Sequence, residues 1–104
     1  MRKVVAYIPD LMDRSKVMSA GAIVTFVRDP TDLAATAAAE DADLVVVDVT
    51  RPGAVAAIEG VTTEVVAFAN HTNRDAMDAA QAAGAGQVMA RSAFFARIGE
   101  LLGG

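Results

Sequence analysis

The stretch 44–53, with the sequence LVVVDVTRPG, constrains the fold of this chain more than any other stretch. Four apolar residues, three of them β-branched, lead directly into Asp48, and a Thr-Arg-Pro-Gly turn follows after one further valine. A continuous apolar run bounded by turn residues is typical of a strand buried on both faces of a parallel sheet. Asp48 is therefore expected at the carboxyl end of a buried strand, the edge where open α/β sheets bind ligands.

Short apolar runs alternate with helical patterns along the chain. Strands are expected at 3–8, 22–27, 44–48, 64–69 and 87–90, and helices at 11–20, 32–42, 54–59, 74–83 and 92–102. Because each link between strands contains a helix, the strands are expected to be parallel and the crossovers right-handed. We predict a single α/β domain, 1–104, with a flavodoxin-like three-layer sandwich: a five-stranded parallel sheet of order 2-1-3-4-5 with helices on both faces.

Polar residues mark the expected starts of the helices. Asp10 or Asp13 is expected to begin the first helix, and Thr31 is a good N-cap for the second. Thr72, followed three residues later by Asp75, resembles a capping box at the start of helix 74–83.

Composition excludes several classes of function. The chain has a formal net charge of −4 and 5% aromatic residues, so it lacks the basic patch and the stacking platform of nucleic-acid-binding proteins. It has no cysteine for a disulfide or thiolate site, and His71 is its only histidine, which leaves too few ligands for zinc. Because no run approaches about 18 apolar residues, we expect no membrane segment and a cytoplasmic protein.

Three features place the chain near a known family. Asp48 ends an apolar third strand, Pro52-Gly53 follows, and the segment 80–85 (AQAAGA) matches the end of a fourth helix. With these features the chain resembles, over essentially its whole length, the receiver domain of two-component response regulators, which is a CheY-like fold. The resemblance implies that Asp48 stands at the phosphoacceptor position. It also implies that Ala69 stands where the family has Ser or Thr, and Arg91 where it has Lys.

Much of the chemistry of that family is missing here. The resemblance implies an acidic pair that binds Mg²⁺ at the end of the first strand, but Ile8 and Pro9 occupy those places and Asp10 comes one residue late. Ala69 has no hydroxyl group, and Val88 stands where the family has a switch aromatic. Phosphoryl transfer needs the metal and the lysine. The sequence therefore predicts a degenerate pseudo-receiver that is not an enzyme and has no cofactor, Mg²⁺ included; a weak cation site at Asp10 and Asp48 is the alternative.

A second resemblance is to small stand-alone receiver-like bacterial proteins. It rests on the first-helix segment 10–16 (DLMDRSK), on His71, and on the segment 91–94 (RSAF) after the last strand. This chain differs from that group because its first helix is about one turn shorter and Pro9 replaces an acid.

The side chains expected around the site allow several interpretations. Asp48 is a fixed partner of Arg91, a solvated loop acid or a phosphorylation site, and Asp10, Ser92, Ala69 and His71 are expected at the edge of the same site. A paired carboxylate has a lowered pKa. His71 is either a pH- or anion-sensing group or an ordinary surface residue.

Two further groups are candidates for binding. Arg14, Ser15 and Lys16 could form an anion pocket with the helix N-terminus, or a solvated first turn in which Arg14 reaches Asp10 or Asp13. Adjacent helical residues point about 100° apart, so Phe94 and Phe95 cannot both point equally into the core. Either one of them lies partly exposed and suits an interface, or both rings cover the rim of the sheet. We expect Met77 and Met89 to fill the core.

From these patterns we predict a non-catalytic protein-interaction module in bacterial signal transduction. Its partner is a protein, with a homodimer through helix 74–83, strand 87–90 and the last helix as one form, and Phe94 and Phe95 as candidate contacts. Nucleic acid and membrane are not expected partners. The alternative is an atypical response regulator phosphorylated on Asp48. A third reading is a small-ligand-binding flavodoxin-like protein, although no glycine-rich phosphate loop follows the first strand.

Overall fold

The computed structural model describes residues 1–103 and contains one parallel sheet of order β2-β1-β3-β4-β5. Its strands are β1 (Lys3–Tyr7), β2 (Ile23–Phe26), β3 (Leu44–Asp48), β4 (Val65–Ala69) and β5 (Gln87–Ala90). The helices are α1 (Leu11–Met18), the 3₁₀ turn η1 (Pro30–Asp32), α2 (Leu33–Ala39), α3 (Ala54–Ile58), α4 (Arg74–Ala82), α5 (Arg91–Ala96) and α6 (Ile98–Gly103). The predicted fold class and strand order are confirmed.

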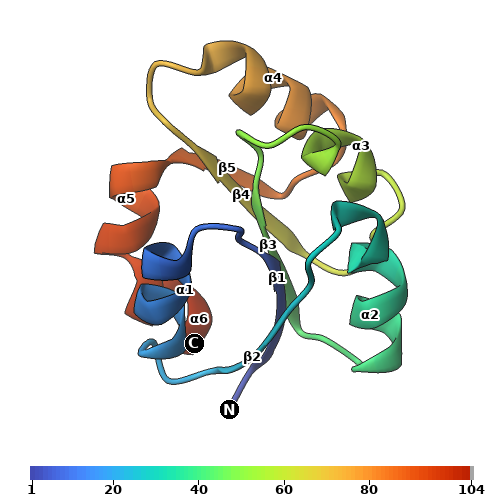
Figure 1. Ribbon diagram of the computed structural model, residues 1–104, viewed down its shortest axis with the longest axis vertical. Coiled ribbons are helices and arrows are strands. Elements are labelled where there is room, and N and C mark those ends of the chain that lie inside the picture. The colour runs from blue at the N-terminus through green and yellow to red at the C-terminus, as the bar shows by residue number, and fades with distance from the viewer. Residues whose placement is uncertain (104) are drawn as a thin grey trace.

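The helices cover both faces of the sheet (Figure 1), with α1, α5 and α6 on one face and α2, α3 and α4 on the other. Every residue of β3 and β4 is buried. Side chains of a strand alternate between faces, so Val46 packs in the core under α1, α5 and α6, whereas Val45 and Val47 pack in the opposite core. The alternation turns Asp48 toward the face that carries α1 and α5.

Two helix caps differ from those that the sequence predicted. Asn73, not Thr72, caps α4, because its side-chain oxygen accepts the N–H of Ala76 at 3.2 Å. Asp29, not Thr31, has the capping hydrogen bond ahead of α2: its carboxylate accepts the N–H of Thr31 at 2.9 Å and begins η1. The N-cap position of α2 itself is Asp32, whose side chain makes no capping hydrogen bond. In both places a neighbouring Asn or Asp takes the capping role, and these residues are at least as good N-caps as threonine.

The last helix is interrupted, whereas the sequence predicted one helix over 92–102. The break lies at Arg97, which has a φ of −110° and follows α5 directly. Gly99, at the second position of α6, has a low helix propensity, which favours a break near it. Within residues 1–103, no helix has the length and apolar character needed to cross a membrane.

Candidate functional site

The carboxyl ends of the central strands surround a cavity of about 220 Å³. Parallel strands all end at one edge of the sheet, so residues at and after the ends of β1, β3, β4 and β5 meet there. The lining residues are Asp10, Asp13, Asp48, Thr50, Arg51, Phe68, Ala69, Asn70 and Arg91. The sequence placed four of them at this site, namely Asp10, Asp48, Ala69 and Arg91.

Asp48 is the last residue of β3 and is 4% exposed. One of its carboxylate oxygens, Oδ1, accepts both the backbone N–H of Thr50, at 3.0 Å, and the Thr50 hydroxyl. This is an Asx turn, in which an acid hydrogen-bonds the backbone two residues later. The interpretation of Asp48 as a solvated loop acid is therefore wrong, because the side chain is buried at the base of the cavity.

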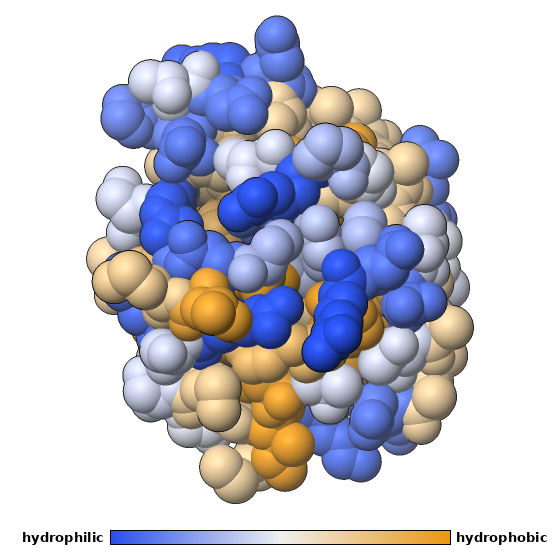
Figure 2. Space-filling view, in the orientation of Figure 1, coloured by the Kyte–Doolittle hydropathy of each residue, from blue (hydrophilic) through white to orange (hydrophobic). Residues whose placement is uncertain are grey.

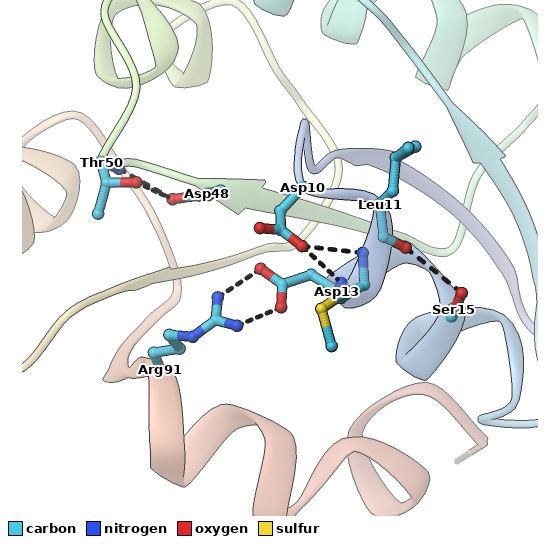
Figure 3. Close-up of polar contacts among 8 residues, drawn as sticks. Asp10, Leu11, Asp13, Ser15, Asp48, Thr50 and Arg91 are labelled. Atoms are coloured by element: carbon cyan, nitrogen blue, oxygen red, sulfur yellow. Dashed lines mark hydrogen bonds and ion pairs between the residues drawn. The ribbon is translucent and has the colours of Figure 1, made fainter.

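Arg91, the first residue of α5, forms an ion pair with Asp13 of α1 (Figure 3). Its Nη1 and Nη2 atoms donate to Oδ2 and Oδ1 of Asp13, so the contact is bidentate. Asp13 is fully buried, whereas 36% of the Arg91 side chain is exposed. The predicted fixed pair of Asp48 with Arg91 is wrong, because the guanidinium binds the carboxylate of Asp13.

The position of Asp13 follows from the phase of α1. Asp13 and Val17 are four residues apart, so they lie on the same side of the helix, and both are buried against the sheet. Helix α5 lies next to α1 on the same face of the sheet, and the long side chain of Arg91 extends from the start of α5 to Asp13. The spacing of Asp13 and Val17 is the sequence signal for this burial, whereas the start of a helix and a contact with Arg14, the roles that the sequence predicts for Asp13, do not require it.

Asp10 caps α1. Its Oδ1 atom accepts the backbone N–H groups of Met12, at 2.9 Å, and of Asp13, at 3.0 Å. The hydrogen bond from Asp13 lowers the pKa of the exposed Asp10 carboxyl below its ordinary value, with smaller contributions from the bond to Met12 and from the charge of Arg91. Asp10 thus lines the cavity and at the same time caps the helix that carries Asp13.

The hydrogen bonds of Asp13 raise the pKa of the Arg91 guanidinium above its ordinary value. The charges of Asp13, Asp10 and Asp48 act in the same direction. Arg91 therefore interacts favourably with all three carboxylates of the cavity, and Arg51, which also lines the cavity, acts on Asp10.

The carboxylates do not fit the Mg²⁺ ion that a receiver domain implies. Both oxygens of Asp13 bind Arg91, one oxygen of Asp48 binds Thr50, and one oxygen of Asp10 binds the backbone of α1. Mg²⁺ demands a nearly ideal octahedron of oxygen ligands. Among residues 1–103, no group of three or more His, Cys, Asp or Glu side chains has an arrangement that could hold a metal ion.

A cluster of three phenylalanines supports Arg91 from the side of the core. Phe94 is completely buried and stacks on Phe68, with ring centroids 4.6 Å apart. Phe95 is partly buried and meets both rings edge to face, and the Arg91 guanidinium and the Lys16 ammonium lie 5.0 and 5.1 Å from its centroid. Phe94 is therefore not available as an interface residue, since its ring fills the core.

Arg14, Ser15 and Lys16 do not converge on an anion pocket. Arg14 donates through Nε to the carbonyl oxygen of Ile8 at 2.6 Å, and its guanidinium lies 5.3 Å from the ring centroid of Phe26. The Ser15 hydroxyl donates to the Leu11 carbonyl at 3.3 Å, while Lys16 faces Phe95. Successive helical residues point in different directions, which separates these three side chains.

The remaining predicted residues divide between the cavity and the surface. Ala69 is buried and lines the cavity, whereas His71 and Ser92 are exposed and do not line it. Asp13, Thr50, Arg51 and Asn70 line the cavity but were not predicted there. Thr50 and Arg51 follow Asp48, and Asn70 follows β4, so their position after strand ends was the signal that could have found them.

Comparison with known proteins identifies the fold. No protein-family model and no curated protein matches the sequence. Solved structures do match. A response regulator from Hahella chejuensis has a TM-score of 0.83 at 18% identity over 99% of this chain and 93% of its own. The chemotaxis response regulator CheY4 of Vibrio cholerae matches with a TM-score of 0.80 at 19% identity, over 99% of this chain and 97% of its own. The receiver domain of the response regulator NarL from Mycobacterium tuberculosis matches with a TM-score of 0.78 at 17% identity, over 96% of this chain and 91% of its own.

The chain has the receiver-domain fold. The resemblance on which the sequence analysis relied is confirmed at the level of the fold. In this fold, Asp48 ends β3, Ala69 ends β4 and Arg91 follows β5, in the order that the resemblance implied.

Proposed function

We propose that this chain is a non-catalytic pseudo-receiver, a protein-interaction module of bacterial signal transduction that acts in the cytoplasm. It needs no cofactor and is not phosphorylated by the Mg²⁺-dependent route. The observation that supports the proposal most is the bidentate pair of Arg91 with Asp13, which engages both oxygens of a carboxylate lining the cavity.

The other side chains around Asp48 support the same conclusion. Transfer of a phosphoryl group relies on positioned positive charge around its oxygens and on a nucleophile that is free to attack. One oxygen of Asp48 is already held by Thr50, and Ala69 offers a methyl group in place of a hydroxyl donor. Of the two arginines that line the cavity, Arg91 is already paired with Asp13, and Arg51 is exposed.

We propose a protein as the partner. Large apolar side chains are exposed on α1 and β2, and Figure 2 shows apolar groups on the side where Figure 1 places these elements. These residues are Leu11, Met12, Met18 and Ile23. A homodimer through α4, β5 and α5 stays a prediction. On that face the contacts would be largely polar, since the exposed residues of α4 include Arg74, Asp75 and Asp78.

A backbone-amide NMR titration tests the proposal. Mg²⁺ is added first and beryllofluoride, a phosphoryl mimic, second, to the wild-type protein and to Asp48→Asn. We expect no amide near Asp48, Asp10 or Arg91 to shift in a way that needs both additions. Shifts that need both, and that Asp48→Asn abolishes, would support the alternative, an atypical response regulator phosphorylated on Asp48.

A further inference from the structure

Three carboxylates and two guanidiniums, those of Arg51 and Arg91, meet at the edge of the sheet, and of the two guanidiniums only that of Arg91 forms an ion pair among the described residues. Asp10, Asp13 and Asp48 line a single cavity, and like charges so placed disfavour one another's ionised form unless a cation lies among them. Arg91 lines the same cavity and binds Asp13 with two hydrogen bonds. Its positive charge comes from the chain itself and is independent of any bound ion, because a guanidinium stays protonated in proteins.

We propose that Arg91 is a permanent internal counter-ion that takes the place of a bound divalent cation among Asp10, Asp13 and Asp48. This inference deepens the proposed function and rests on it. It assigns the direct ionic contact of the site to one side chain, with Arg51 adding a second positive charge at the exposed rim, and it keeps the arrangement of the cavity the same whether divalent cations are present or absent.

The same side chain joins α1 to α5. Arg91 of α5 binds Asp13 of α1, and the Phe95 ring of α5 lies within 5.1 Å of the Lys16 ammonium of α1. Phe95 in turn contacts Phe68, which pairs with Asp48 in the register of β3 and β4. Arg91 therefore holds two helices together over the site, which is a contact that a diffusible ion could not make alone.

Removal of the guanidinium has a specific consequence. Asp13 is fully buried, and a buried carboxylate that loses its cation strongly destabilises the folded state. In Arg91→Ala, both oxygens of Asp13 are released toward the same cavity as Asp10 and Asp48. As they lie in the structure the three carboxylates form no metal site, but a released Asp13 side chain can turn toward the other two. We therefore expect the variant to gain a response to Mg²⁺, which prefers oxygen ligands, that the wild-type protein lacks.

Thermal and urea denaturation in Mg²⁺, at constant ionic strength and with EDTA reversal, test this inference. The wild-type protein is compared with Arg91→Ala and with the control Arg97→Ala, which removes an exposed arginine paired with Glu100 at 3.4 Å. We expect Mg²⁺ to leave the midpoints of the wild type and of Arg97→Ala unchanged and to raise that of Arg91→Ala. With free Mg²⁺ at about ten times its Kd, the folding equilibrium constant of Arg91→Ala increases about 11-fold.

A double variant covers the case in which Arg91→Ala does not fold without metal. Asp13→Asn combined with Arg91→Ala removes both charges of the pair. We therefore expect the double variant to have higher denaturation midpoints than Arg91→Ala, and we expect Mg²⁺ to leave these midpoints unchanged. A wild-type midpoint that rises with Mg²⁺ as much as that of Arg91→Ala would overturn the inference. Denaturation midpoints of Arg91→Ala that do not change with Mg²⁺ would also overturn the inference. The proposed function would still stand in that case, provided that no amide shift of the wild-type protein requires both Mg²⁺ and beryllofluoride.

Discussion

The backbone N–H of Asp13 donates to the carboxylate of Asp10 at 3.0 Å, so the first acid of α1 fixes the helical turn that carries the second. The two acids have opposite environments, since Asp10 is exposed at the cap and Asp13 is buried against the sheet. One turn of helix therefore presents one carboxylate to solvent and one to Arg91. Their separate roles predict separate effects of substitution.

Substitution of Asp13 is expected to destabilise the fold. Asp13→Asn keeps the size of the side chain but removes the negative charge that pairs with Arg91. Hydrogen bonds to charged groups contribute about 1.5–3 kcal/mol each. Because Arg91 is partly exposed and can be hydrated in the variant, we expect a loss of about 2–3 kcal/mol in the free energy of unfolding, measured by urea denaturation. Glu100→Gln is the control, because its ion pair is exposed and is expected to contribute less than about 1 kcal/mol. Equal losses in the two variants would contradict a special role for Asp13.

The lowered pKa of Asp10 predicts a dependence of stability on pH. Its folded pKa lies below the ordinary value of 3.8, so the stabilisation is complete above that value and disappears as the pH falls through the folded pKa. Asp10→Asn keeps a good N-cap but cannot titrate. We expect the wild type to be more stable than Asp10→Asn near neutral pH and the difference to vanish in acid, as measured by urea denaturation at a series of pH values. A difference that stays constant down to pH values well below 3.8 would contradict this assignment.

The sequence was sufficient to predict the layers of the fold because each strand is an apolar run bounded by turn residues. It also placed Asp48, Ala69 and Arg91 at the ends of β3, β4 and β5, since these positions follow from the strand boundaries alone. What it could not predict was the partner of Arg91. Asp13 and Arg91 are 78 residues apart, and their contact depends on how α1 is rotated over the sheet, which no local pattern of the sequence determines.

The boundaries of the helices were the other point at which the sequence was insufficient. Thr72 and Asn73 are both capping residues, and only the path of the loop decides which side chain reaches the free N–H groups of α4. The same holds for Asp29 and Thr31 before α2. The break at Arg97 lies between two segments that both have core-facing residues, so the apolar periodicity continued through it.

Substitution of Asp48 is expected to have a smaller effect than substitution of Asp13. In Asp48→Ala the N–H and hydroxyl of Thr50 lose their acceptor, but Thr50 is exposed and water can replace it. We expect a loss of about 1–2 kcal/mol in the free energy of unfolding, and less in Asp48→Asn, whose side-chain oxygen can still accept both bonds. Urea denaturation of the two variants measures this. A loss in Asp48→Ala larger than that in Asp13→Asn would indicate that Asp48, not Asp13, carries the main ionic contact of the site.

The two adjacent phenylalanines of α5 provide a matched pair of substitutions. Phe94→Ala removes a completely buried ring that stacks on Phe68, and such truncations cost about 3–5 kcal/mol because they lose apolar burial and leave a cavity. Phe95→Ala removes a partly buried ring whose outer neighbours are the cations of Lys16 and Arg91, so less apolar area is lost. We expect Phe94→Ala to lose at least about 1 kcal/mol more free energy of unfolding than Phe95→Ala, measured by urea denaturation. If Phe95→Ala were the more damaging variant, the contact of its ring with the two cations would be the stronger link between α5 and α1, and Arg91 would stabilise the site through Phe95 as much as through Asp13.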